Sequence, residues 1–326
     1  MRPMANAKPF ILLVVIVPFL GTVLAMVLLW QRDVHWTDLA LLATMYTCTA
    51  FGQTIGYHRM LTHRSFRPHP VVKLILLVFG AMAVEAPPVE WAATHIKHHA
   101  QSDHEGDPHS PLEGLFHAHL GWLFKDRFAD PHQYARHLLK DPIVVFVNRT
   151  FLLWVVLSLV IPFMIGGWTG FLWGALVRIF IGHHVSFSVN SVCHTFGKRE
   201  FETNDRSHNE WIVGLLAFGE GWHNNHHAFP RSAFHGLHWW QFDFSGYVIW
   251  TLERLGLVHD VYRVSPTLLG RSSFRKVSLM PSSPQSENEV KDCEKLPLRG
   301  SNYLPLASTG SKQKGTDYGE TNHEGH

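Results

Sequence analysis

The chain has 326 residues and a mass of 37.2 kDa, which suits one large domain or two ordinary ones. Charged residues make up only 17%, against about 25% in typical soluble domains, so a wholly water-soluble protein is disfavoured. Three cysteines are too few for a disulfide-stapled secreted domain, and a formal charge of +2 gives no support for nucleic-acid binding. Histidine is unusually frequent, with 25 residues.

The first apolar run covers residues 9–30 and contains no charged side chain. At about 1.5 Å per residue, a helix of this length crosses a hydrocarbon core of about 30 Å. A cleaved signal peptide is the alternative interpretation. Against it, the run exceeds a usual signal core, and no small-residue cleavage pattern follows before Gln31. We therefore expect a transmembrane helix here.

Four more apolar runs follow, at residues 35–57, 71–89, 150–167 and 168–190. The last two are joined by a short turn at Gly166–Gly167, which predicts antiparallel neighbouring helices. Two polar, His-rich blocks, residues 91–148 and 194–263, together form what we call the cap. Residues 265–326 are polar and lack apolar periodicity, so we expect a disordered tail after a membrane domain of residues 1–264.

Basic residues predict the orientation. Lysine and arginine precede the first run and recur in the first polar block, whereas the Gly166–Gly167 turn has none. By the positive-inside rule, both termini and the cap face the cytoplasm, in a bacterial inner membrane or an endoplasmic-reticulum-type membrane.

The histidines gather in four motifs. These are His58 with His63; His95 with His98 and His99; His194, preceded by Asn190; and His223 with His226 and His227. Residues three or four apart share a helix face, and neutral imidazole is a preferred ligand for iron, zinc, copper and nickel. One HxxH motif alone is more often accidental, but two HxxHH motifs and an HxxxxH near helix ends favour a metal site. Nine imidazoles exceed the needs of one ion and fit two ions with four or five ligands each.

All four motifs must then lie on one side of the bilayer, which has a consequence for residues 71–89. If that run crossed, the second motif would lie about 30 Å from the first. We expect the run to lie in the interface or to dip and return, as Glu85 and Pro87–Pro88 allow. The predicted fold is an all-α membrane protein with four transmembrane helices, one interfacial or re-entrant helix and a helical cytoplasmic cap that holds a two-metal site.

The remaining histidines have other expected roles. His104, His109, His117 and His119 follow the second motif and are expected to support the ligands. Histidines scattered elsewhere, His235 among them, are expected to be spectators.

Five stretches carry a family resemblance: HRMLTHRSF, EWAATHIKHH, DPHSPLEGLFHAHLGW, VNSVCH and GEGWHNNHHAFP. In kind, order and spacing they resemble the membrane-bound fatty acyl desaturases of the Δ9 acyl-CoA and acyl-lipid type, over residues 54–264. The resemblance implies a di-iron enzyme that uses O2 and two electrons to place a cis double bond in a saturated acyl chain. It carries the ligand roles onto the nine histidines of the four motifs, with Asn190 reaching one iron through water, and implies no catalytic residue separate from these ligands.

An apolar tunnel is expected to hold the acyl chain with one carbon pair at the metals. Thr54, Ala50 and Tyr46 repeat every four residues before His58 and share its helix face, and Phe187 on the fifth run is a further lining candidate. Tyr46 would close the deep end, or else merely pack between helices. The fifth run also contains Arg178, His183 and His184. We expect these side chains to face the tunnel, to reach toward the cap or to form hydrogen bonds between helices.

Substrate head group and electron donor stay open. VEAPPVEW and Ile96–Lys97 depart from the animal acyl-CoA enzymes, so acyl-CoA, acyl-lipid and acyl-carrier-protein substrates are all retained. No haem-binding HPGG stretch or dinucleotide-binding glycine motif is present, which predicts a separate ferredoxin, rubredoxin or cytochrome b5-like donor.

Two other functions compete with the desaturase. An acyl or alkane hydroxylase would use the same di-iron chemistry and make an alcohol. A membrane metal transporter or sensor would place its ligands within the membrane, whereas these histidines lie at helix ends and in polar blocks.

Overall fold

The computed structural model describes residues 7–31, 34–125 and 129–272. The chain separates into two units, Met1–Arg275 and Lys276–His326. The second unit, with most of the tail that we expected to be disordered, lies outside the described residues. The start of that tail is instead a helix, α13 (Pro266–Ser272). The described part is mostly helical. Its two-stranded sheet pairs β1 (Arg67–Pro68) with β2 (Val258–His259), and Arg67 lies opposite His259.

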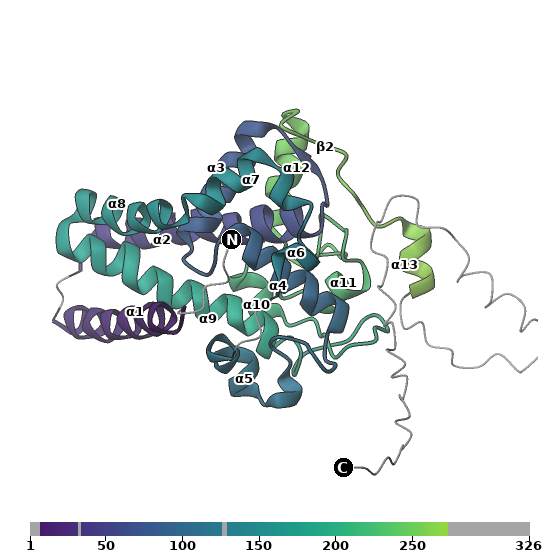
Figure 1. The fold of residues 1–326 in the computed structure, drawn as a ribbon, viewed down its shortest axis with the longest axis horizontal. Coiled ribbons are helices and arrows are strands. Elements are labelled where there is room, and N and C mark those ends of the chain that lie inside the picture. The colour runs from purple at the N-terminus through teal and green to yellow at the C-terminus, as the bar shows by residue number, and fades with distance from the viewer. Residues whose placement is uncertain (1–6, 32–33, 126–128, 273–326) are drawn as a thin grey trace, which may run out of the picture. The chain divides into compact units, whose positions relative to one another are not determined.

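Four apolar helices pack together: α1 (Ala7–Trp30), α2 (Trp36–Phe51), α8 (Phe151–Phe171) and α9 (Arg178–Ser191) (Figure 1). A π-helix, η5 (Leu172–Val177), leads from α8 into α9. Two described segments, Pro9–Leu29 and Phe151–Ser191, are long and apolar enough to cross a membrane. The second contains both of the runs expected on either side of the glycine turn.

The chain reverses at Gly167, where φ is 62°, a left-handed conformation that favours glycine. Packing after the turn is close: a Cβ on Gly170 would lie 2.6 Å from the carbonyl oxygen of Pro162, and one on Gly174 2.8 Å from the Cβ of Pro162. The two halves are therefore neighbouring, antiparallel helices, as the sequence predicted.

The helical segment at the expected span of residues 35–57 is longer than predicted. The helix α2 continues without a break into a π-helix, η1 (Gly52–Thr62), so the helical segment ends five residues later than expected. It is not one of the two segments that qualify by length and composition. Four crossings are therefore not established by those two criteria.

The expected interfacial segment at residues 71–89 covers one helix and the start of a second. Helix α3 (Pro70–Met82) ends early, and α4 (Pro88–Gln101) begins at the proline pair. With 13 residues, α3 is about 20 Å long, shorter than a hydrocarbon core of about 30 Å. Its last carbonyl groups are satisfied from α9: Arg178 donates to the Met82 oxygen at 2.7 Å, and the His183 Nε2 lies 3.0 Å from the Ala83 oxygen.

The core lies where η1 packs against α3 and α4. A Cβ on Gly52 would lie 2.1 Å from the backbone nitrogen of Gly80, so the two backbones touch. Ile55, Leu77 and Ala92 are fully buried there.

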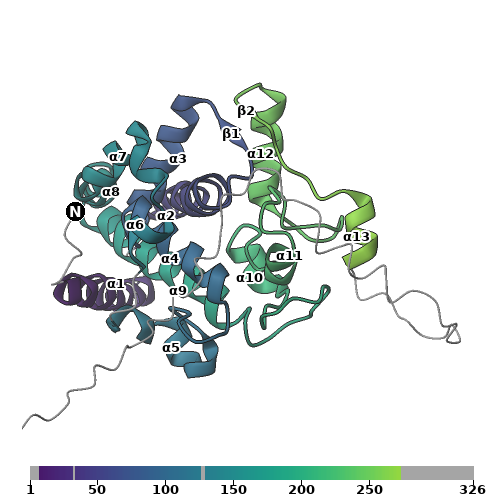
Figure 2. The ribbon, with the colours of Figure 1, turned by 45° about the vertical axis from the view of Figure 1, so that its right-hand side comes forward.

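Short helices complete the cap (Figures 1 and 2). They are η2 (Pro111–Glu113), α5 (Leu115–His119), η3 (Gly121–Phe124), α6 (Pro131–Tyr134), η4 (Leu138–Lys140), α7 (Pro142–Arg149), α10 (Trp211–Leu216), α11 (His223–Ala228) and α12 (Phe244–Arg254).

Candidate metal centre

All nine histidines of the four motifs come together in two groups. The first group consists of His58, His63, His95, His99 and His226, and the second of His98, His194, His223 and His227. Within each group, the facing ring nitrogens all lie within 4.8 Å of one another, so each group could hold a metal ion. The groups adjoin: the rings of His99 and His227 stack with centroids 4.5 Å apart.

Each HxxHH motif is divided between the two groups. On α4, His95 and His99 join the first group and His98 the second, whereas on α11, His223 and His227 join the second group and His226 the first. On a helix, residues i and i+4 lie nearly above one another. Residue i+3 projects to the other side of the line that joins these two residues. One helical turn can therefore serve two sites.

The HxxxxH motif depends on the π-helix. In η1 the hydrogen bonds join residues five apart, and the His63 nitrogen donates to the His58 oxygen at 3.1 Å. Residues five apart are thereby brought over one another, which they are not in an α-helix. The rings of His58 and His63 meet with centroids 4.7 Å apart, and both join the first group.

The spacing of the ring nitrogens fits a bound ion. In the first group, Nε2 atoms lie 3.1 Å apart for His58 and His226 and 3.0 Å apart for His226 and His99. In the second group, the Nε2 of His223 lies 2.9 Å from that of His194. Two nitrogens bound at about 2.1 Å are about 3.0 Å apart at a right angle and about 3.4 Å apart at a tetrahedral angle. The observed spacing is therefore close enough for the rings of each group to share one ion.

Carboxylates hold the opposite nitrogens of several rings. The Nδ1 atoms of His98, His194 and His227 lie 2.9, 2.7 and 2.7 Å from Asp107, Asp103 and Asp205, respectively. A ring that donates from Nδ1 to a carboxylate keeps an unprotonated Nε2 for a metal. The Nε2 of His98 is also buried without a hydrogen-bond partner among the described residues. These aspartates were not identified from the sequence, although Asp103 and Asp107 closely follow the second motif.

Burial favours the neutral form of several grouped histidines. Desolvation, with a smaller effect from neighbouring histidines, lowers the pKa of His63, His95 and His99 well below the ordinary value. The pKa values of His223 and His226 are lowered well below it for the same reasons. Neutral rings with free electron pairs are the ligand form that metals require.

A buried ionic network supports the first group. The Oε2 of Glu220 lies 2.6 Å from the Nδ1 of His58 and 3.2 Å from that of His235, and Oε1 accepts from Arg59. Arg59 is fully buried and also contacts Asp243. Burial raises the pKa of Glu220, but His235, His58 and Arg59 together hold it well below its usual range. His235, expected to be a spectator, is therefore part of the site's surroundings.

The supporting histidines are placed unevenly. The ring of His109 packs 4.3 Å from that of His98, beside Asp107. His119 instead contacts His184 and Ser191, each at 2.9 Å. His104 is exposed and contacts the Ser102 oxygen, while His117 lies 3.8 Å from Glu113. Of these four, His109 packs directly on one of the nine grouped histidines.

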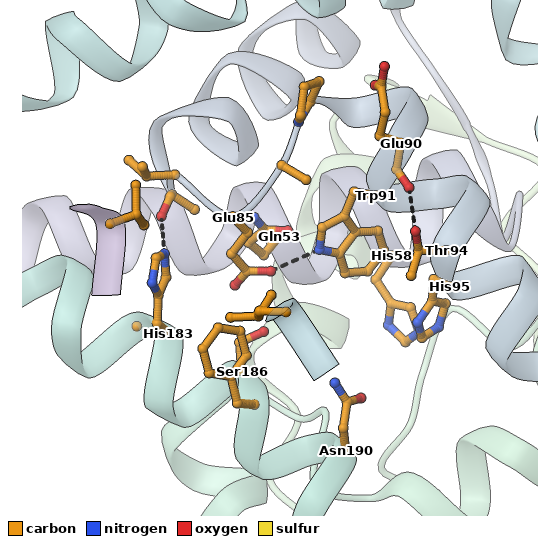
Figure 3. Close-up of a pocket in the computed structure, with 18 of the residues that line it drawn as sticks. Gln53, His58, Glu85, Glu90, Trp91, Thr94, His95, His183, Ser186 and Asn190 are labelled. Atoms are coloured by element: carbon orange, nitrogen blue, oxygen red, sulfur yellow. Dashed lines mark hydrogen bonds between the residues drawn. The ribbon is translucent and has the colours of Figure 1, made fainter. Parts of the chain in front are cut away.

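A cavity of about 1020 Å³ adjoins the first group. It reaches from His58 and His95 along α2 and α9, and its walls include Tyr46, Ala50, Thr54, Phe187 and Asn190. Figure 3 shows Asn190 pointing into the space between α9 and the two histidines. Glu85 also lines the cavity and accepts from the Trp91 Nε1 at 2.8 Å (Figure 3). Trp91 in turn stacks on His95, with centroids 5.1 Å apart.

Comparison with known proteins identifies the family. The sequence matches the family model described as fatty acid desaturase over residues 34–250. The chain belongs to this family. It is therefore an oxidoreductase of lipid metabolism and is membrane-associated.

Individual desaturases resemble the chain over most of its length. A hex-5-enoyl-[acyl-carrier protein] acetylenase of Moorena producens (strain JHB) is 40% identical, covering 76% of this chain and 83% of that protein. An acyl-CoA 5-desaturase of Anemone leveillei is 42% identical, covering 74% and 76%. An sn-1 stearoyl-lipid 9-desaturase of Anabaena variabilis is 38% identical, covering 69% and 84%. Their names give different bond positions and different acyl carriers.

Proposed function

We propose that this desaturase inserts a cis double bond at the Δ9 position of a saturated long-chain acyl thioester or lipid ester. The reaction consumes O2, two electrons and two protons and yields the alkene and two waters. The observation that carries the proposal is the pair of imidazole groups at the end of a large cavity, in a chain of this family.

We assign two iron ions to the two imidazole groups. The close approach of the ring nitrogens and the carboxylates that hold several rings from behind support one ion in each group. Bound iron would supply the O2-dependent oxidation that removes two hydrogens from adjacent methylene carbons. Asn190, at the cavity wall, is assigned a water-mediated contact with one ion.

The residues of the chain position the substrate. Tyr46 lies 12 residues before His58 on a continuous helix, so the wall between them is up to about 18 Å long. An acyl chain lying along Thr54, Ala50 and Phe187 would bring one carbon pair to the imidazole groups. The apolar wall would also exclude water from the reacting carbons.

The proposed topology has four crossings, at residues 9–30, 35–57, 150–167 and 168–190, with α3 dipping in from the cap side. The short length of α3 and the α9 donors at its carboxyl end support this arrangement. The cap and both termini would face the cytoplasm, where a separate ferredoxin, rubredoxin or cytochrome b5-like protein would deliver electrons.

Fatty-acid methyl-ester analysis of cells that express the chain tests the proposal. We expect a new cis alkene at C9, absent with His226→Ala and retained with His259→Ala, whose side chain is exposed on β2. An alcohol product would indicate a hydroxylase, and a bond at another carbon would overturn the Δ9 assignment. Turnover of the purified chain with NAD(P)H alone would contradict the separate donor.

A further inference from the structure

The second polar block carries an exposed apolar surface, which we call the Trp-rich face. On α10, its members are Trp211, Ile212, Leu215 and Leu216, which are 44–64% exposed. On α12 and the segment before it, its members are Trp239, Trp240, Phe242, Phe244, Tyr247 and Trp250. Ten large apolar or aromatic side chains gathered in two neighbouring segments are more than the scattered exposure that soluble surfaces show.

The α12 part has the pattern of a helix lying in a membrane interface. Phe244, Tyr247 and Trp250 recur at three-residue spacing along one side, while Ile249 on the other side is fully buried. The Arg254 guanidinium lies 5.2 Å from the ring centre of Trp250. Aromatic rings with a basic side chain beside them are typical of side chains at the depth of lipid headgroups.

The α10 part is attached to a helix of the membrane bundle. The Tyr46 hydroxyl donates to the Leu216 oxygen at 2.7 Å. The Phe218 ring then packs against Tyr46 and Phe51, with centroids 5.7 and 5.0 Å away, and against Phe244 at 5.7 Å. Phe218 thus links α10, α12 and α2.

These contacts define the level along α2 at which α10 is attached. Phe51 and Tyr46 precede His58 by 7 and 12 residues, or by up to about 10 and 18 Å along the helix, since the π-helical residues rise less than α-helical ones. If α2 crosses the bilayer as proposed, the residues joined to Tyr46 lie below the headgroups of the cap-side leaflet.

We infer that the Trp-rich face is immersed in the bilayer, with α10 in the acyl region and α12 at the interface. The occupant of this surface is lipid, and the second polar block is partly embedded, contrary to the expectation of an entirely cytoplasmic cap. The inference rests on the proposed crossing of α2. It gives the enzyme a second membrane attachment, beside the cavity wall that Tyr46 and Ala217 line.

Site-directed spin labelling of the full chain in lipid nanodiscs tests the inference. Nitroxide labels are placed at Leu215→Cys and Trp250→Cys, with Glu202→Cys, an exposed acidic position of the same block, as the control. The unsubstituted chain measures background labelling of its own cysteines. Collisions with O2, which concentrates in lipid, are compared with collisions with a water-soluble nickel chelate.

We expect the ratio of O2 to nickel collisions to be several-fold higher at Leu215 and Trp250 than at Glu202. A nickel-accessible Leu215 would overturn the inference, because that face would then be in water. Exclusion of both reagents would also overturn it, because a second copy or another protein would then cover the face. Ile212→Cys replaces Leu215→Cys if the latter does not fold. Methyl-ester analysis of the same variants reads the desaturase activity separately, so failure of the two proposals can be distinguished.

Discussion

The Oε2 of Glu220 lies 2.6 Å from the Nδ1 of His58, with both groups buried. The other oxygen of Glu220 is held by Arg59. Because His58 then turns its Nε2 toward His226, the carboxylate sets the direction of a ring that belongs to the first imidazole group.

Glu220→Gln is expected to lower iron affinity or activity by about 10- to 100-fold, the usual effect of losing a carboxylate behind a ligand. The amide keeps the shape but removes the charge that pairs with Arg59. Iron per chain and methyl-ester products measure the effect. Glu253→Gln is the matched control, since that carboxylate pairs with Arg263 away from the site. Unchanged iron binding in Glu220→Gln would remove Glu220 from the supporting network.

Single substitutions on α4 are expected to affect different ions. His99→Ala should deplete the first imidazole group and His98→Ala the second, each lowering iron from two ions per chain toward one and abolishing activity. Metal analysis of purified protein and its Mössbauer spectrum distinguish the two losses. Identical spectra for the two variants would show that the groups are not separate binding sites.

Tyr46→Ala is expected to let longer acyl chains be desaturated, because the ring lines the cavity about 18 Å from His58. Tyr46→Phe is the control: it keeps the ring but loses the hydrogen bond to Leu216. Competition between acyl substrates of different length, read by lipid analysis, measures the change. An unaltered length preference in Tyr46→Ala would assign the ring to packing alone.

Gly52→Ala is expected to destabilise the protein by more than about 3 kcal/mol, because the new Cβ would meet the backbone of Gly80 and no side chain can move away. Gly182→Ala has nothing within 4 Å of the new Cβ and is expected to be neutral or slightly stabilising. Thermal unfolding in detergent compares the two helical glycines. Equal unfolding midpoints would mean that η1 and α3 can separate at this contact without destabilising the protein.

Much of this site follows from sequence spacing, and some of it does not. The i, i+3, i+4 pattern of His95, His98 and His99 predicts a shared face, and the count of nine predicts two ions. The division of each triplet between two groups depends on how α4 and α11 face each other, which is a tertiary relationship. The pairing of Asp205 with His227 across 22 residues is equally invisible in a single sequence.

The fold was predictable where composition is extreme. The reversal at Gly167 follows from two glycines between apolar runs. The π-helical form of η1 was missed, because the HxxxxH spacing reads as two residues on different faces of an ordinary helix. The end of α3 at Met82 was not predicted, since apolar composition continues past it, whereas the proline pair does indicate where α4 begins.

Since α4 and α11 each give histidines to both groups, neither helix can tilt or slide without altering the two imidazole groups together. The distance between the ions would then be a property of the scaffold rather than of any bridging side chain. If the proposed irons are bound, a substitution that loosens the packing of α4 or α11 should therefore broaden the magnetic spectra of both ions at once.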